Sequence, residues 1–158
     1  VETLGIRLSP DRQRWYGEPG RESRRTFFRQ TRGMRLDDLR DKAGAEPLSE
    51  RLWRRYGRRA FEMLDHIRED PTMAEDILGS TDYLRVELHN TASTEMIVHL
   101  DDFLRRRTKI SLITRSENIK NSKGLDEVVS ILFGPNAQTK LDEYLSSNPS
   151  QMMPTKNN

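Results

Sequence analysis

The hydrophobic residues of the chain recur at helical spacing from about residue 49 to residue 68. Those on the main stripe follow one another at steps of four, four, three and four: Leu52, Tyr56, Ala60, Met63 and Ile67. This spacing keeps side chains on one face of an α-helix, so it predicts an amphipathic helix. Ser49 is the expected N-cap, with Pro47 and Leu48 just outside the helix. Gly57 lies inside the pattern and costs a helix about 1 kcal/mol relative to alanine.

Further helical patterns follow as far as residue 145. The predicted helices span residues 82–98, 100–107, 125–133 and 137–145. Gly134 and Pro135 are expected to close the third of them, and residues 72–78 have room for two turns at most. No alternation of apolar and polar residues persists for six positions, as a half-buried strand would require. The pattern therefore predicts an all-α fold, a small bundle of about four to six helices.

The two ends of the chain show less periodicity. Residues 1–47 are interrupted by glycines and prolines and are predicted to form an irregular lead-in, with one short helix near residues 34–42. Aromatic residues are expected to pin this lead-in to the domain or to missing parts of the protein: Trp15, Tyr16, Phe27 and Phe28. Residues 147–158 have little apolar content and are predicted to be disordered. The expected organisation is therefore a lead-in, a helical domain over residues 48–146, and a tail.

Composition narrows the class of protein. The chain has 158 residues, enough for one domain with tails. It contains no cysteine, which excludes disulfide frameworks, thiolate zinc sites and cysteine nucleophiles. No apolar run approaches the roughly 18–20 residues that span a bilayer, so a soluble chain is expected. The first residue is Val1 rather than methionine, which suggests a piece of a longer protein.

The charge is nearly balanced, with 27 basic and 25 acidic side chains and a net charge of +2. The basic excess lies in the first 47 residues, where arginine predominates. Arginine forks pair with phosphates and with carboxylates alike. The arginines therefore indicate either contact with nucleic acid or phosphate, or a surface laced with ion pairs. The nearly neutral total favours the ion pairs.

Familiar catalytic motifs are absent from the sequence. Neither GxGxxG nor GxxxxGK[ST] occurs, so no phosphate cradle is expected. The histidines, His66, His89 and His99, lie far apart and have no second ligand at metal spacing, which favours surface or packed roles over metal binding or base catalysis. Glu87 and Glu95 are a candidate carboxylate pair for acid–base chemistry, although glutamates that face an arginine are the simpler interpretation.

Two segments of the chain carry a more specific pattern. Residues 48–57 read LSERLWRRYG, and residues 83–113 read YLRVELHNTASTEMIVHLDDFLRRRTKISLI. Together they resemble the C-terminal helical domain of the FAD-dependent, aerobic glycerol-3-phosphate dehydrogenases, whose pattern is L-[ST]-E…(R)-Y-G, then A/V-E-L…E-x-A/W, then D-D-x-L-x-R-R-T. The matching positions are Leu48, Glu50, Tyr56, Gly57, Glu87, Glu95, Asp101, Asp102, Leu104, Arg106, Arg107 and Thr108. The R-R-T ending is the most specific part.

The resemblance implies an accessory cap domain that is inactive alone and packs on the FAD-binding catalytic domain of the same chain. It implies a full enzyme that oxidises glycerol 3-phosphate to dihydroxyacetone phosphate and passes electrons through FAD to a quinone. Such an enzyme is cytoplasmic, peripheral to the inner face of the cell membrane, and has contacts in a homo-oligomer. The FAD and substrate sites of the family belong to the preceding Rossmann-type domain. No catalytic, cofactor-binding or metal-binding residue is therefore assigned here, and no nucleic acid is expected as partner.

A structural motif is expected instead. Its members are Glu87, Glu95, Asp101, Asp102, Arg106, Arg107 and Thr108. Glu95 lies 11 or 12 residues before the two arginines, and a tight turn through residues 98–101 would bring them together. We expect Glu95 to accept a charge-assisted hydrogen bond from Arg106 or Arg107, which would fix the crossing of two helices.

Two other function classes are also compatible with the sequence. A nucleic-acid-binding helical module would use the arginines of residues 51–59 and the basic run of residues 105–109 on phosphates, and its binding would weaken steeply with salt. The acidic residues between these arginines count against it, and a helix C-terminus explains the basic run equally well. A membrane-surface contact is the third class, but no predicted helix sets a Lys/Arg-dominated face opposite aromatic residues.

Overall fold

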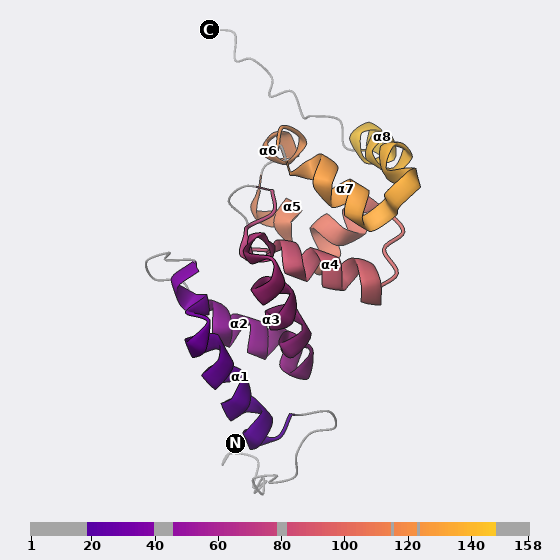
Figure 1. Ribbon diagram of the computed structural model, residues 1–158. Helices are drawn as coiled ribbons and strands as arrows, with labels where there is room; N and C mark the ends of the chain where they lie inside the picture. Colours follow the sequence, from indigo (N-terminus) through magenta and orange to yellow (C-terminus); the bar gives the residue numbers. More distant parts are fainter. Residues whose placement is uncertain (1–18, 40–45, 79–81, 115, 123, 148–158) are drawn as a thin grey trace, which may run out of the picture. The chain divides into compact units, whose positions relative to one another are not determined.

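The computed structural model describes residues 19–39, 46–78, 82–114, 116–122 and 124–147 (Figure 1). The chain forms two compact units, Val1–Phe61 and Glu62–Asn158, and each is described by itself. Trp15 and Tyr16, the predicted helical stretch beyond residue 39, and most of the predicted tail lie outside the described residues. The prediction of a lead-in, a helical domain and a tail concerns a different division and stays a prediction.

The first unit begins with a helix that the sequence analysis missed. Helix α1 (Arg21–Gly33) lies within the segment predicted to be an irregular lead-in, so that prediction is wrong for these residues. Its buried positions are Phe27 and Thr31, four residues apart and thus on one face. Two buried positions among five arginines do not form a recognisable apolar period in the sequence. A short 3₁₀ turn (Leu36–Leu39) follows, where the sequence predicted a longer helix.

The long helix predicted over residues 49–68 is broken in the middle. Helix α2 (Leu48–Tyr56) ends at Gly57, which has a φ of +53° and leads into a 3₁₀ turn (Gly57–Arg59). Only glycine adopts this conformation without strain, and a Cβ here would lie 3.2 Å from Cγ of Pro19. The chain resumes as α3 (Ala60–Glu69). The glycine that the pattern treated as a tolerated cost therefore ends the helix.

Helix α2 also starts differently from the prediction. Its N-cap is Pro47, so Ser49 is inside the helix and is not the cap. The backbone N–H and the hydroxyl of Ser49 instead donate to the two carboxylate oxygens of Asp37, at 2.7 and 2.9 Å. Asp37 thus supplies from a distant turn the acceptor that an N-cap side chain ordinarily provides.

Aromatic rings form the centre of the first unit. The Phe27 ring is fully buried and lies 5.1 Å from Trp53 and 5.5 Å from Phe61, centroid to centroid. The Phe28 ring meets Phe27 edge to face at 5.5 Å. Such pairs contribute about 0.5–1.5 kcal/mol beyond the area that they bury. Phe27 and Phe28 therefore anchor α1 on α2, as the sequence analysis expected of them.

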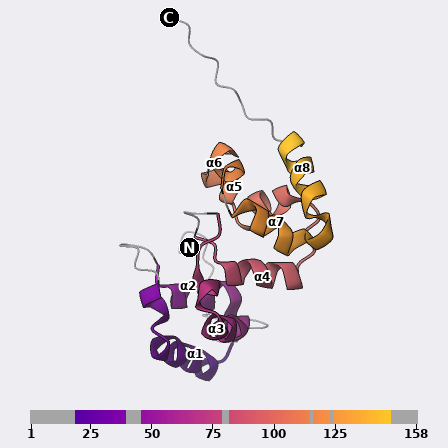
Figure 2. The same cartoon turned by 45° about the horizontal axis from the view of Figure 1, so that its top comes forward.

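The second unit is built around α7. Its main helices are α4 (Arg85–Thr94), α7 (Leu125–Phe133) and α8 (Ala137–Ser147), and α7 packs against both others (Figures 1 and 2). Shorter elements are a 3₁₀ turn (Pro71–Ala74), a π-helical turn (Asp102–Arg107), α5 (Ile110–Ile113) and α6 (Ser116–Lys120). The side chains of Leu88, Phe103, Leu104 and Val128 are fully buried in its core.

Some of the helices predicted for this unit are confirmed and others differ from the prediction. The helix over residues 125–133 is confirmed with its Gly134 ending, and the helix over residues 137–145 is confirmed and extends to Ser147. The helix predicted over residues 82–98 is shorter at both ends, and residues 102–107 adopt a π-helical turn. The all-α prediction is confirmed for the described part of the chain, where the one element of β-pairing is an isolated bridge between Asp76 and Leu84.

Phe27→Ala should destabilise the first unit by about 3–5 kcal/mol, because it removes a fully buried ring from an aromatic cluster. Urea unfolding followed by tryptophan fluorescence reports the change, since Trp53 contacts the deleted ring. Leu39→Ala is the control, because Leu39 is half exposed and its loss should cost less than about 0.5 kcal/mol. Equal midpoints for the two variants would contradict the assigned core.

Candidate functional site

Glu87 caps the start of α4. Its side chain is fully buried, and its Oε2 accepts a hydrogen bond from the backbone N–H of Leu84 at 2.9 Å. This is the backward-reaching half of a capping box, and it satisfies one of the free N–H groups at a helix start. The carboxylate faces the interior of the unit, so the structure gives Glu87 a capping position instead of an accessible one for acid–base chemistry.

Two buried hydroxyl groups, those of Tyr83 and Thr91, lie next to each other beside α4. The phenol of Tyr83 lies 2.8 Å from the hydroxyl of Thr91 and 3.4 Å from the carbonyl oxygen of Glu87, to which it donates. Both hydroxyls are buried, and this contact gives each of them a hydrogen-bond partner. Glu87 and Thr91 therefore serve the packing of α4.

Glu95 and Arg107 come together as the sequence spacing indicates. Helix α4 ends at Thr94, and the extended residues after it let Oε2 of Glu95 lie 2.7 Å from Nε of Arg107. The contact is an ion pair, but the N–H direction does not make a hydrogen bond to that oxygen. The expected proximity is thus confirmed with Arg107 and not Arg106, while the expected hydrogen bond is not formed.

Asp102 and Arg106 belong to the π-helical turn, and Thr108 caps its C-terminal end. Asp102 accepts a hydrogen bond from the backbone N–H of His99 at 3.3 Å and pairs with Arg106 at 2.9 Å. The Thr108 hydroxyl donates to the carbonyl oxygen of Phe103 at 2.9 Å, which closes the turn. Phe103 and Leu104 on the inner side of this turn are fully buried. The D-D-x-L-x-R-R-T segment therefore folds as a closed turn that drives two apolar residues into the core.

Asp101 lies near the C-terminal helix of the unit. Burial raises the pKa of the Tyr144 phenol on α8, and the negative charge of Asp101 raises that pKa further. The motif residues from position 95 to position 108 thus gather around one turn. Glu87 belongs to a separate buried cap at the other end of α4.

Arg85 is the residue that sequence reasoning missed. Its Nε lies 2.5 Å from Oε1 of Glu127 on α7, and its Nη1 donates to the carbonyl oxygen of Thr72 at 2.7 Å and to Oε2 of Glu75 at 3.0 Å. The hydrogen bond to Glu127 is the largest cause that raises the pKa of the Arg85 guanidinium above its already high usual value; the bond to Glu75 raises it further, and burial opposes the shift. Arg85 and Glu127 are 42 positions apart in the sequence, so no local pattern could indicate this pairing.

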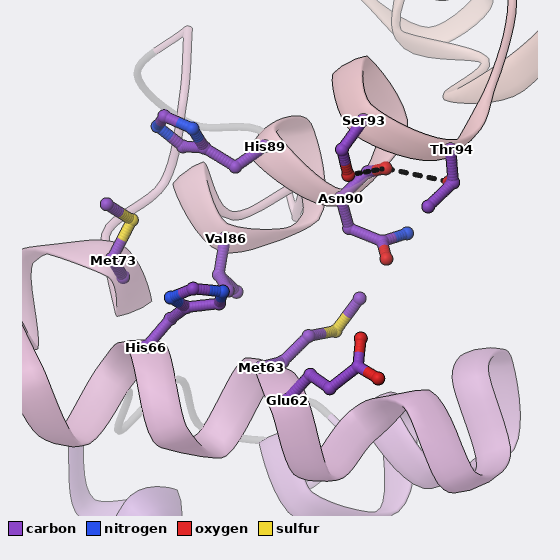
Figure 3. Close-up of a pocket in the computed structure, with 9 residues that line it drawn as sticks. All are labelled: Glu62, Met63, His66, Met73, Val86, His89, Asn90, Ser93 and Thr94. Carbon is purple, nitrogen blue, oxygen red and sulfur yellow. Dashed lines mark hydrogen bonds between the residues drawn. The ribbon is translucent and has the colours of Figure 1, made fainter.

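A hollow of about 370 Å³ lies between α3 and α4 within the second unit (Figure 3). His66 and Met63 on α3 face His89 and Val86 on α4 across it. Met63 and Val86 are buried and both histidines are exposed, so the floor is apolar and the rim polar. In the part of the chain that the structure describes, no three His, Cys, Asp or Glu side chains group at metal-binding distance.

His99 lies apart from that hollow. Its Nδ1 is 3.5 Å from a carboxylate oxygen of Glu143 on α8. The sequence-based preference for surface histidines agrees with the exposed positions of His66, His89 and His99. Of the helices described here, none has the length and apolar content needed to cross a bilayer.

The geometry defines a class of protein: an all-helical module whose polar residues cap, close and cross-link its own helices. The family described as the C-terminal domain of alpha-glycerophosphate oxidase matches residues 25–139. The chain belongs to this family.

Individual relatives are also similar to the chain. The "Glycerol-3-phosphate dehydrogenase 2" proteins of Mycobacterium bovis and of two Mycobacterium tuberculosis strains are each 32% identical to it over 80 residues. That alignment covers 51% of this chain and 14% of each relative, so the chain corresponds to a small part of these proteins. No solved structure matches the chain.

Arg85→Ala should lower the free energy of unfolding of the second unit by about 2–3 kcal/mol, because it strips a charged partner from Glu127 and frees the Thr72 carbonyl. Chemical denaturation of Arg85→Ala, Glu127→Gln and the double variant measures the coupling between the two side chains. If the double variant loses as much unfolding free energy as the two single variants together, the pair is not coupled.

The Glu95–Arg107 pair should contribute less than about 1 kcal/mol, because the Arg107 side chain is 56% exposed and solvent screens the charges. A double-mutant cycle with Glu95→Gln and Arg107→Gln measures it in low and high salt. A coupling of several kcal/mol that persists in high salt would mean that the pair is buried in solution.

Proposed function

We propose that this chain is the C-terminal accessory domain of an FAD-dependent glycerol-3-phosphate dehydrogenase. The family match over residues 25–139 is the observation that carries the proposal. It includes the Glu87 cap, the Arg85 cross-link and the whole turn around Thr108. The relatives named as glycerol-3-phosphate dehydrogenase support the same assignment.

The chain does not itself fit FAD. A dinucleotide site places its pyrophosphate on a glycine-rich turn between a strand and a helix. The described residues form no strand, and α4 starts from a buried leucine whose N–H is already held by Glu87. No step of the reaction is therefore assigned to residues of this chain. The proposed enzyme would hold FAD, oxidise glycerol 3-phosphate and reduce a quinone in its catalytic domain.

The proposed role of the domain is mechanical. It packs on the FAD-binding domain of the same polypeptide and stabilises it. Contacts in a homo-oligomer, a cytoplasmic location and peripheral attachment to the inner face of the membrane are further parts of this proposal. Its motif residues act inside the domain: Glu87 fixes the start of α4, and the turn that contains Asp101, Asp102, Arg106 and Thr108 fixes the path after it.

Removal of this domain from the parent enzyme should lower flavin retention and glycerol 3-phosphate–dependent dye reduction together, because the catalytic domain would lose the surface that packs on it. Flavin absorbance after gel filtration and the dye assay measure the two effects. Removal of residues 148–158 alone is the control and should leave both unchanged. A shortened enzyme that keeps its flavin and its full rate would contradict the proposed role.

A further inference from the structure

Charge is divided unequally between the two units of the chain. Residues 1–61 contain 16 basic and nine acidic side chains, a net charge of +7, whereas residues 62–158 contain 11 basic and 16 acidic ones, a net charge of −5. All but one of the basic residues in the first unit are arginine. The nearly neutral total therefore conceals a strongly basic unit, and the balance that favoured internal ion pairs does not hold within it.

The basic excess gathers on one face of α1. The arginines of this helix are Arg21, Arg24, Arg25, Arg29 and Arg32. At about 100° per residue they fall within an arc of roughly 140°. Phe27 and Thr31, the buried residues of α1, lie outside that arc. We call these five residues the arginine face.

Most of the arginine face has no counter-charge among the described residues. Arg24 lies 3.5 Å from a carboxylate oxygen of Glu50 and 5.1 Å from the centroid of the Phe28 ring. The other four are exposed, and within the described part of the chain they make no ion pair and no side-chain hydrogen bond. Like charges held on one helix face repel one another, so a partner that supplies negative charge relieves that repulsion.

A hollow of about 650 Å³ adjoins this face. Arg21, Arg25 and Arg32 contribute to its lining, and so do Asp37 and Glu50. Asp37 is occupied by the two hydrogen bonds from Ser49, and Glu50 by Arg24. The hollow therefore offers unpaired guanidinium groups next to carboxylates, a mixed surface instead of a uniformly basic groove.

This surface suits a folded protein better than a nucleic acid or a membrane. A phosphate backbone in the hollow would meet two carboxylates, and single-stranded nucleic acid would need an open aromatic ring to stack on. Phe27 is buried, and Arg24 lies over the ring of Phe28. A membrane would need the apolar face of α1, which the core of the unit already uses. Separate carboxylates on a protein surface fit the planar forks of arginine.

We propose that the arginine face of α1 docks on an acidic surface of the FAD-binding part of the same polypeptide. This inference rests on the proposed function, and it names the surface through which the accessory domain would attach. The relatives are consistent with such a partner, because the aligned region is 14% of their length and the rest of each relative lies outside it.

Zero-length cross-linking of the full-length parent enzyme tests the proposal. Arg25→Lys and Arg32→Lys keep the positive charge and supply an amine that a carbodiimide joins only to a carboxylate in direct contact. We expect each variant to give a cross-linked peptide between α1 and an aspartate or glutamate of the FAD-binding part, identified by mass spectrometry. Arg58→Lys, an exposed arginine of the same unit that lies outside α1, is the matched control and should give no such peptide.

Two results would overturn the inference. One is the absence of the cross-link in both α1 variants. The other is salt-sensitive binding of a single-stranded RNA or of anionic liposomes by the parent enzyme that is lost in an Arg25→Glu/Arg32→Glu double variant. The deletion experiment separates this failure from that of the proposed function: an enzyme that needs the domain but gives no cross-link refutes the docking surface alone. An enzyme that is indifferent to the deletion refutes the function.

Discussion

The arrangement of the second unit depends on the guanidinium group of Arg85. One side chain at the start of α4 reaches the 3₁₀ turn before it through Thr72 and Glu75, and reaches α7 through Glu127. Its side chain is 21% exposed, and water competes less with its bond to Glu127, which is 36% exposed, than with its bond to Glu75, which is 62% exposed. Glu87, two residues later, fixes the first turn of the same helix from inside. The position of α4 thus depends on Arg85, which bonds to neighbouring elements, and on Glu87, which caps the helix from inside.

The fold was predictable from the sequence where helices are regular and end on local signals. The segment 125–133 has both properties, because Gly134 takes a φ of +51° at its end. Residues 48–69 show the limit: their apolar period continues through Gly57, but the backbone there turns to a φ of +53° and divides one expected helix into two. Periodicity records which face is buried, whereas the break depends on a dihedral angle that glycine permits but does not require.

In the candidate site, too, contacts between residues close in sequence were predictable, whereas contacts made by helix packing were not. Glu95 and Arg107 are 12 residues apart across one turn, so spacing alone could pair them, although it could not give the N–H direction that prevents a hydrogen bond. Arg85 and Glu127 are brought together only by the packing of α7 on α4, which no local pattern encodes. Helix α1 escaped notice because its aromatic anchor, Phe27, meets its partners Trp53 and Phe61 only after the chain has folded back.

The same residue type therefore serves two purposes in this chain, and the acceptors around it distinguish them. Arg85 bonds to three residues of its own unit, so its charge is used internally and offers little to an outside molecule. Arg25 and Arg32 are exposed on a helix whose other face is committed to an aromatic core, and the described residues provide them with no acceptor. A solvated arginine at such a position lowers the stability of the fold little. Its interactions become most favourable when a partner brings carboxylates to it. Among the described residues, helix α1 thus presents positive charge that lacks a counter-charge, whereas Arg85 uses its charge inside its own unit.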